Sequence, residues 1–92
     1  MKLSDLTEFL VKSLVKNPDE VSVRAFDDDE LITIEVLVSE EDMGRVIGKK
    51  GMIANAIRTI VQASSYLNHE KKVHINIASL WRFFSRILWM VN

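Results

Sequence analysis

The sequence predicts an α+β domain in which helices cover one face of a three-stranded mixed sheet, with an extra apolar segment at the C-terminus. Three observations favour this fold class. Hydrophobic periodicity runs in the order helix, strand, strand, helix, helix, strand. A short acidic turn joins the first two strands, which favours an antiparallel hairpin. About 30 residues separate the second and third strands, which suits a parallel, right-handed crossover.

Residues 3–16 predict an amphipathic helix, because apolar side chains recur there at spacings of three and four. These side chains are Leu3, Leu6, Phe9, Leu10 and Leu14. Pro18 ends the helix, since the residue before a proline is disfavoured in the helical region. Residues 21–25 and 31–38 alternate as β-strands around the acidic turn 27–30. The expected buried face of the second strand comprises Ile32, Ile34, Val36 and Val38.

The region 39–67 predicts two helices that meet at a pair of glycines. We expect Ser39 to cap a short first helix, whose acidic first turn suits the positive end of the helix dipole. A longer helix spans about 51–67, and the turn 68–70 closes it. Its expected apolar stripe comprises Ile53, Ala56, Ile57, Ile60, Val61 and Ser64. Residues 73–77 alternate as the third strand.

Residues 1–78 form the predicted domain, and residues 79–92 form an amphipathic segment outside its pattern. As a helix, the segment gathers its polar side chains on one narrow side. It could be core of the same chain, a partner-binding face or a membrane-surface anchor. We expect it to bury apolar side chains against protein, because strand alternation leaves an apolar patch on the outer sheet face. The side chains are Trp81, Phe84, Leu88 or Trp89, and the patch is Phe26, Leu31 and Leu37.

Composition excludes several classes of protein. The chain has 92 residues, enough for one domain, and its 48% hydrophobic and 27% charged content is typical of globular proteins. Without cysteine it has no disulfide scaffold, Cys-ligated zinc site or thiol nucleophile. His69 is expected in a turn and His74 on a solvent face, so no metal or cofactor is expected. The acidic start and the lack of a long apolar run predict a cytoplasmic protein with no membrane span.

Charge is distributed unevenly along the chain, although the net charge is only −1. Residues 1–44 hold four basic and twelve acidic side chains, whereas residues 45–92 hold eight basic side chains and one acidic side chain. The second half could therefore present a positive face to an anion, unless folding intermixes the two halves.

Two glycines flank two lysines in the loop Gly48-Lys49-Lys50-Gly51, directly before the longer helix. Glycine allows a positive φ and a close approach of another backbone. Such a turn leaves the first amides of the next helix pointing outward, which favours binding of an anion. A surface turn with solvated lysines is the simpler interpretation of the four residues alone. The preceding Ile47 and the aliphatic helix that follows favour the anion site.

This V-I-G-K-K-G stretch with its aliphatic helix resembles the signature of a KH domain, an RNA-binding module. The order of elements is similar to the type II KH arrangement. The motifs Asn17-Pro18-Asp19-Glu20 and Ala56-Ile57-Arg58-Thr59 further resemble the small single-KH bacterial proteins of the KhpA family. The resemblance covers about residues 1–78.

The resemblance implies a groove that clamps about four nucleotides of a single RNA strand, or of single-stranded DNA, with the glycine-flanked loop on the backbone. The matching positions are Gly48, Lys49, Lys50 and Gly51 in the loop, Ile47, Ala54 and Ile57 around the groove or its core, and Arg45, Asn55 and Arg58 nearby. It further implies an RNA chaperone or post-transcriptional regulator that affects cell-wall synthesis and cell shape. The implied partners are a second copy, a larger Jag-type KH protein (KhpB), or both.

Two other classes of function are weighed beside RNA binding. A protein-interaction module with a KH-like fold would dimerise and contact RNA only incidentally, but it has no need of a cationic loop. An enzyme is disfavoured, because the phosphate-binding G-x-x-x-x-G-K-[ST] pattern is absent and no histidine, serine and acid meet on the loop. The acidic turn 27–30 could hold a divalent cation, but such turns are usually only solvated.

Overall fold

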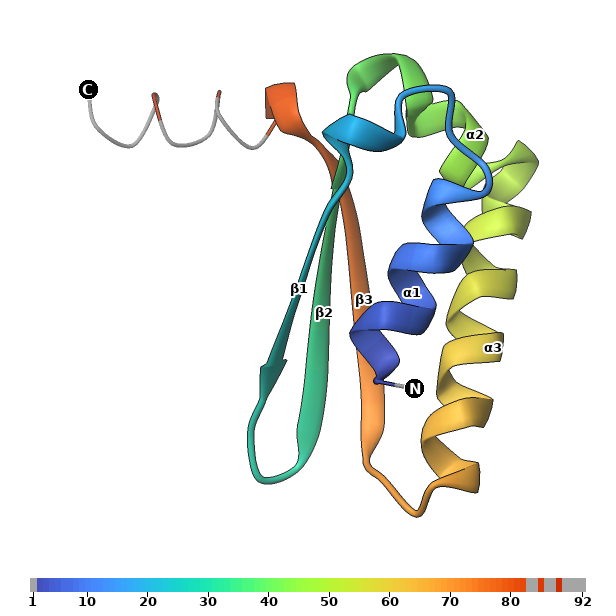
Figure 1. The fold of residues 1–92 in the computed structure, drawn as a ribbon, viewed down its shortest axis with the longest axis vertical. Coiled ribbons are helices and arrows are strands. Elements are labelled where there is room, and N and C mark those ends of the chain that lie inside the picture. Colours follow the sequence, from blue (N-terminus) through green and yellow to red (C-terminus); the bar gives the residue numbers. More distant parts are fainter. Residues whose placement is uncertain (1, 83–84, 86–87, 89–92) are drawn as a thin grey trace.

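A three-stranded mixed sheet carries helices on one face in the computed structural model, which describes residues 2–82, 85 and 88 (Figure 1). The strands are β1 (Ser22–Asp27), β2 (Leu31–Val38) and β3 (Lys72–Ser79), in the spatial order β1-β2-β3. β1 pairs antiparallel with β2, whereas β3 pairs parallel with β2. The predicted fold class, hairpin and parallel crossover are therefore confirmed.

The helices follow the predicted order with changed boundaries. They are α1 (Leu3–Lys12), α2 (Met43–Ile47) and α3 (Met52–Leu67), with single 3₁₀ turns η1 (Pro18–Glu20), η2 (Glu40–Asp42) and η3 (Lys49–Gly51). α1 ends four residues earlier than the predicted 3–16. The cause is tertiary, because the backbone N–H groups of Lys16 and Asn17 donate to the side chain of Asp42 instead of continuing the helix.

The core lies between the inner sheet face and the helices α1 and α3. Its buried members are Leu3, Val11, Ile32, Ile34, Val36, Val38, Val46, Ile57, Val61 and Ile75. This confirms the predicted buried face of β2. The predicted stripe of α3 is partly wrong, because Ala56 and Ile60 are exposed, whereas Ala54 and Ser65 are buried. Ser65 can be buried because its Oγ donates a 2.5 Å hydrogen bond to the carbonyl oxygen of Lys71.

Asp42 is a fully buried carboxylate that joins the turn after α1 to the start of α2. It accepts hydrogen bonds from the backbone N–H groups of Lys16 (2.9 Å) and Asn17 (3.0 Å), and from the amide of Asn17 (3.1 Å). Ser39 Oγ (3.0 Å) and Arg45 Nη1 (3.2 Å) also donate to it. The prediction that the Ser39 side chain caps the helix is therefore wrong, because its hydroxyl donates to the Asp42 carboxylate instead. Burial alone would raise the pKa of Asp42, but these hydrogen bonds lower it to about 2.

Two of the described apolar side chains after β3 are exposed. Trp81 is 66% and Leu88 60% exposed, so the expectation that they are buried is not met within the chain itself. Phe84 and Trp89 lie outside the described residues. On the outer sheet face Leu37 is buried but Phe26 is 54% exposed. Within the described part of the chain, no helix is long and apolar enough to cross a membrane.

We predict that Asp42→Asn lowers the melting temperature by about 5–15 °C at neutral pH, because several buried donors lose their acceptor. The folded-state pKa of about 2 lies below the ordinary 3.8, so ionised Asp42 stabilises the fold above about pH 4 and loses this effect down to about pH 2. The variant should lack this part of the acid-induced loss. Thermal melts between pH 7 and pH 2 measure both effects. Asp19→Asn, an exposed acid in η1, is the control, and equal melts for all three proteins would contradict the role of Asp42.

Candidate nucleic-acid interface

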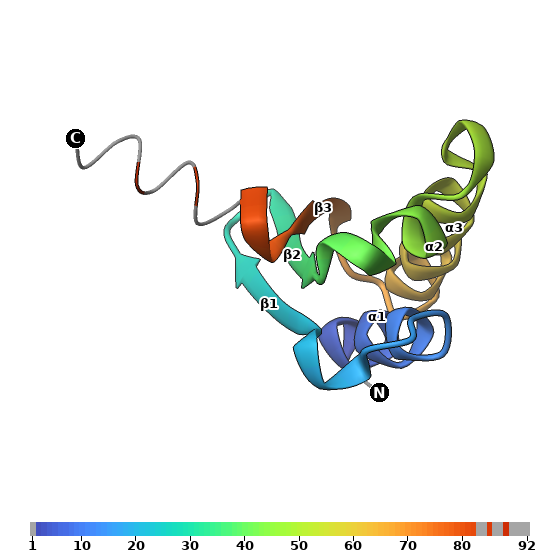
Figure 2. The same cartoon turned by 90° about the horizontal axis from the view of Figure 1, so that it is seen from above.

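The glycine-flanked loop lies between α2 and α3, at the end of the molecule away from the β1–β2 hairpin (Figure 1). Viewed from above, the start of α3 projects away from the sheet, so the loop stands at a free corner (Figure 2). Both Lys49 and Lys50 are exposed. The predicted loop therefore occupies an accessible place at the start of the longest helix.

Gly48 is required by sterics as well as by backbone conformation. Its φ is +75°, in the region that side chains rarely adopt. A Cβ there would lie 2.6 Å from Cγ1 of Ile53 on the first turn of α3. The chain therefore turns tightly against α3 only because position 48 lacks a side chain. The amide of Gly48 ends α2 by donating to the carbonyl oxygen of Gly44 at 2.9 Å.

The other half of the loop also has left-handed backbone. Lys50 has a φ of 57° and Gly51 a φ of 76°, and Gly51 N–H donates to the carbonyl oxygen of Gly48 at 3.1 Å. Lys50 holds a conformation that costs a non-glycine residue about 1–2 kcal/mol. No side chain caps α3 and no acid lies in its first turn. Its partial positive charge is therefore free for an external anion, with two lysines beside it.

The polar residues predicted near the loop fall into two groups. Arg45 lies in α2 and reaches back to η2, where Nη1 donates to Asp42 and to the carbonyl oxygen of Glu41 at 3.2 Å each. Arg58 and Asn55 lie together on α3, joined by a 3.1 Å hydrogen bond. The Arg58 guanidinium also reaches the Ile75 carbonyl oxygen on β3 at 3.4 Å. Asn55 and Arg58 thus bridge α3 and the free edge of the sheet, whereas Arg45 supports the Asp42 cluster.

The predicted aliphatic residues beside the loop lie mostly beneath the surface and form the floor of this region. Ile47 is half-buried, while Ala54 is 1% and Ile57 4% exposed. A ligand on this side would therefore meet Ile47 directly and Ala54 only through small movements of its neighbours.

Sequence reasoning missed one charged contact at the hairpin. The ammonium group of Lys71 pairs with Asp27 and also donates to the carbonyl oxygen of Asp28. This hydrogen bond to Asp27 raises the pKa of Lys71. The acidic turn is therefore partly neutralised, and Lys71 is not free for an anion. The parallel pairing Leu31↔Lys72 brings these residues together, and no local sequence pattern shows it.

A mixed sheet after one N-terminal helix, crossed by two helices that meet at a glycine-flanked loop, defines a KH domain. A family model described as the KhpA/KhpB KH domain matches residues 4–77, and the chain belongs to this family. The relatives include the RNA-binding protein KhpA of Clostridium perfringens, 47% identical over 82% of this chain and 99% of the relative. KhpA of Listeria monocytogenes is 44% identical, over 82% of this chain and 97% of the relative.

A solved structure also shares the fold. Era in complex with MgGDPNP and nucleotides 1506–1542 of 16S ribosomal RNA superposes with a TM-score of 0.63. The match covers 87% of this chain and 32% of Era, at 16% identity. At that identity it supports the fold alone.

We predict that alanine changes the stability in a graded order at the three glycines, with losses at Gly48 and Gly51 and a gain at Gly44. Gly48→Ala combines a positive φ with a clash against Ile53 and should cost about 2–4 kcal/mol. A Cβ at Gly51 would meet only Nδ2 of Asn55, at an ordinary contact distance of 4.0 Å, so in Gly51→Ala the positive φ alone should cost about 1–2 kcal/mol. Gly44→Ala, in α2 with nothing within 4 Å of its Cβ, should stabilise the protein by about 0.5–1 kcal/mol. Urea titration measures the order, and equal stability of the first and third variants would contradict the loop geometry.

Proposed function

We propose that this protein binds single-stranded RNA and holds the sugar-phosphate backbone at the loop from Gly48 to Gly51. The observation that carries the proposal is the uncapped start of α3, flanked by Lys49 and Lys50 at an exposed corner. Phosphate oxygens would accept hydrogen bonds from free backbone amides there and neutralise the lysines. Ile47, Ala54, Asn55 and Arg58 continue from the loop toward β3 and would contact the following nucleotides, with Arg45 supporting the loop from α2.

The proposal extends to the role of the protein in the cell. The chain's relatives are RNA-binding proteins, and no phosphate-transfer motif occurs in the sequence, so we propose a binding function without catalysis. We further propose a cytoplasmic RNA chaperone or post-transcriptional regulator with effects on cell-wall synthesis and cell shape. It would pair with a Jag-type KH protein (KhpB) through its KH unit, residues 1–78, leaving 79–92 as a separate segment.

We predict that Lys49→Asp/Lys50→Asp abolishes most RNA affinity at moderate salt and changes stability by less than about 0.5 kcal/mol. Two positive charges become negative at the proposed phosphate site, while the apolar core is untouched. For single strands each neutralised phosphate contributes about 0.7 to the slope of log affinity against log salt. Losing two contacts should flatten that slope by about 1.4. A salt titration with short unstructured RNA, beside a thermal melt, measures both.

The matched control is Lys2→Asp/Lys12→Asp, which makes the same change in net charge on exposed positions of the α1 region. It should retain most of the affinity. Unchanged RNA affinity in a folded loop variant would contradict the proposed RNA site. Equal losses of RNA affinity in the two variants would show a nonspecific charge effect instead.

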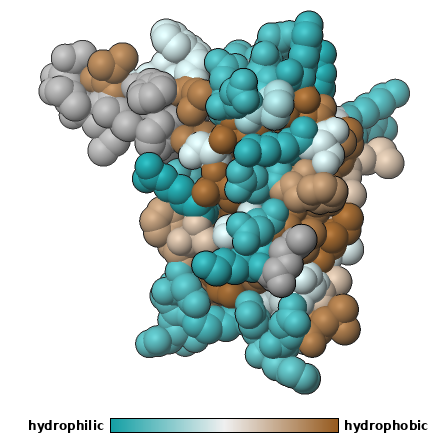
Figure 3. Space-filling model, viewed as in Figure 1, coloured by the Kyte–Doolittle hydropathy of each residue, from teal (hydrophilic) through white to brown (hydrophobic). Residues whose placement is uncertain are grey.

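The solvent-facing side of α3 favours a second function, self-association. α3 contains one charged residue among its 16, namely Arg58, although one whole side of it faces solvent. Solvent-facing helices usually carry charge on that side. Exposed apolar residues recur there at spacings of four and three: Met52 (68% exposed), Ala56, Ile60 (47%), Ala63 and Leu67 (81%). In Figure 3, brown and tan atoms lie along the right side of the molecule, the side on which Figure 1 draws α3.

The order of large and small side chains in this α3 stripe is nearly symmetric about Ile60. An antiparallel second copy would place Met52 opposite Leu67 of the partner subunit and Ala56 opposite Ala63 of the partner subunit. The alanines would allow close approach, and the same patch serves both subunits of a two-fold dimer. The two loops would then lie at opposite ends of the helix pair, about 24 Å apart, so one dimer could hold two segments of a strand with avidity.

We predict that Ile60→Asp converts this dimer to a monomer, because it places a charge at the centre of the apolar contact. Light scattering measures the mass. Phe9→Asp is the matched control, since Phe9 is an apolar side chain 63% exposed on α1. A wild type that is monomeric at micromolar concentration would contradict the dimer while leaving RNA binding untouched.

A further inference from the structure

A pocket of about 480 Å³ lies on the outer side of the sheet, beyond the glycine-flanked loop and its aliphatic floor. Its lining includes Glu35, Leu37, Arg58, Asn76, Ala78 and Arg82. Such a volume is within the range of small-molecule sites. The pocket combines residues of β2, β3, α3 and the turn after β3, so no single segment of the sequence reveals it.

Outward-facing residues of β2 and β3 form the floor of the pocket. Glu35 pairs with Asn76, and Leu37 pairs with Ala78 in the next outward-facing row of the parallel ladder. The floor therefore has one polar row and one apolar row, side by side. In the apolar row Ala78 is half-buried and Leu37 lies beneath the surface at 7% exposed, while Glu35 and Asn76 offer hydrogen bonds.

Two arginines form the walls. Arg58 is held at the free edge of β3 by the carbonyl oxygen of Ile75. Arg82 lies in the helical turn 80–82 after β3, and its N–H donates to Ser79 Oγ at 3.0 Å. Both are exposed at the pocket. The pocket thus holds one carboxylate between two strong donors.

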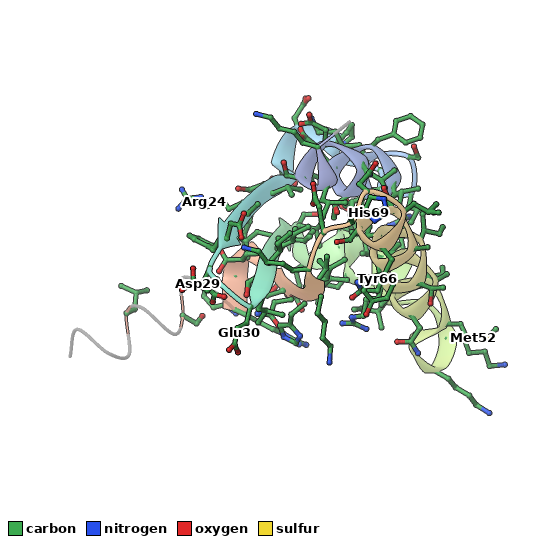
Figure 4. All side chains as sticks on the ribbon, turned by 90° about the horizontal axis from the view of Figure 1, so that it is seen from below. Arg24, Asp29, Glu30, Met52, Tyr66 and His69 are labelled. Carbon is green, nitrogen blue, oxygen red and sulfur yellow. The ribbon has the colours of Figure 1, made fainter. Side chains whose placement is uncertain are left out.

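The Glu35 carboxylate has acceptors that no described residue uses. Arg24 is its neighbour in the antiparallel register, yet Arg24 extends away from the sheet into solvent (Figure 4). Among the residues that the structure describes, none forms an ion pair or a hydrogen bond with the Glu35 carboxylate. Glu35 is nevertheless half-buried on the central strand, and carboxylates are seldom buried without a partner.

We propose that this pocket, formed by Glu35, Asn76, Arg58 and Arg82, selects a guanine base of the bound strand. An acceptor-only carboxylate repels phosphate, so the pocket suits a base rather than the backbone. Guanine is the base whose Watson–Crick edge offers two adjacent N–H donors, N1–H and the N2 amino group, to one carboxylate. Its O6 and N7 accept from an arginine, and its ring can lie on the apolar row.

The position relative to the loop fits one continuous strand. Arg58 follows Gly51 by seven residues, about 10 Å along the axis of α3. A strand held at Gly51 would therefore pass Asn55 and reach the pocket within a few nucleotides. The inference rests on the proposed RNA function and adds base selection to it.

The test measures the affinity of an eight-nucleotide oligouridine and of versions with one guanosine at each position in turn. Wild type should bind one of the guanosine-containing strands about tenfold more tightly than oligouridine. Inosine at that position, which lacks the N2 amino group, should lose part of this gain. Glu35→Gln should remove the preference and keep the affinity for oligouridine, since the loop is unchanged.

Glu30→Gln is the matched control, because it removes the same charge from an exposed residue near the hairpin tip (Figure 4). It should keep the guanosine preference. Equal affinity of wild type for all strands, or a folded Glu35→Gln protein that retains the preference, would overturn the guanine pocket. A folded wild type that binds none of the strands would instead overturn the proposed RNA function, on which this inference rests.

Discussion

The parallel pairing of β3 with β2 is the constraint on which the rest of this structure depends. Eight register pairs, from Leu31↔Lys72 to Val38↔Ser79, require the chain to return to the starting end of the sheet before β3 begins. That return must cross over one face, and α2, the glycine-flanked loop and α3 make the crossing. The loop lies where the chain reverses, so it meets solvent at the corner while both neighbouring helices are anchored in the core.

Two local interactions keep this corner in one conformation. Asp42 ties the turn after α1 to the start of α2, and the close approach of Gly48 to Ile53 sets the angle at which the chain enters α3. Ordering a loop costs conformational entropy when a ligand binds, and a loop that is already ordered avoids most of this cost. The proposed four-nucleotide site would benefit from such preorganisation, because a small site has few contacts to offset the ordering of the RNA itself.

The free edge of the sheet, at β3, links the region of the loop to the outer sheet face. Because β3 lies at the edge, its outer backbone groups are not used by a fourth strand, and Arg58 can reach across from α3 to the carbonyl oxygen of Ile75. This contact connects α3, whose start forms part of the proposed phosphate site, to the free edge of the sheet. The α3 stripe contains neither the loop lysines nor Asn55 and Arg58, so the proposed self-association and the proposed RNA binding need not compete for the same residues.

The sequence by itself determined the order of elements, the mixed sheet and the glycine-flanked loop, because hydrophobic period, turn residues and crossover length are local properties of the chain. It did not determine the rotation of α3, the early end of α1 or the burial of Asp42. The rotation of α3 accompanies a hydrogen bond from Ser65 to the Lys71 carbonyl oxygen, six residues further on, beyond the end of the helix. The early end of α1 and the burial of Asp42 depend on partners distant in sequence, because Lys16 and Asn17 lie 26 and 25 residues from Asp42. The pocket around Glu35 has the same origin. Only the parallel register sets Glu35 beside Asn76, and only the packing of α3 brings Arg58 to them, since contacts between remote segments follow from the tertiary structure.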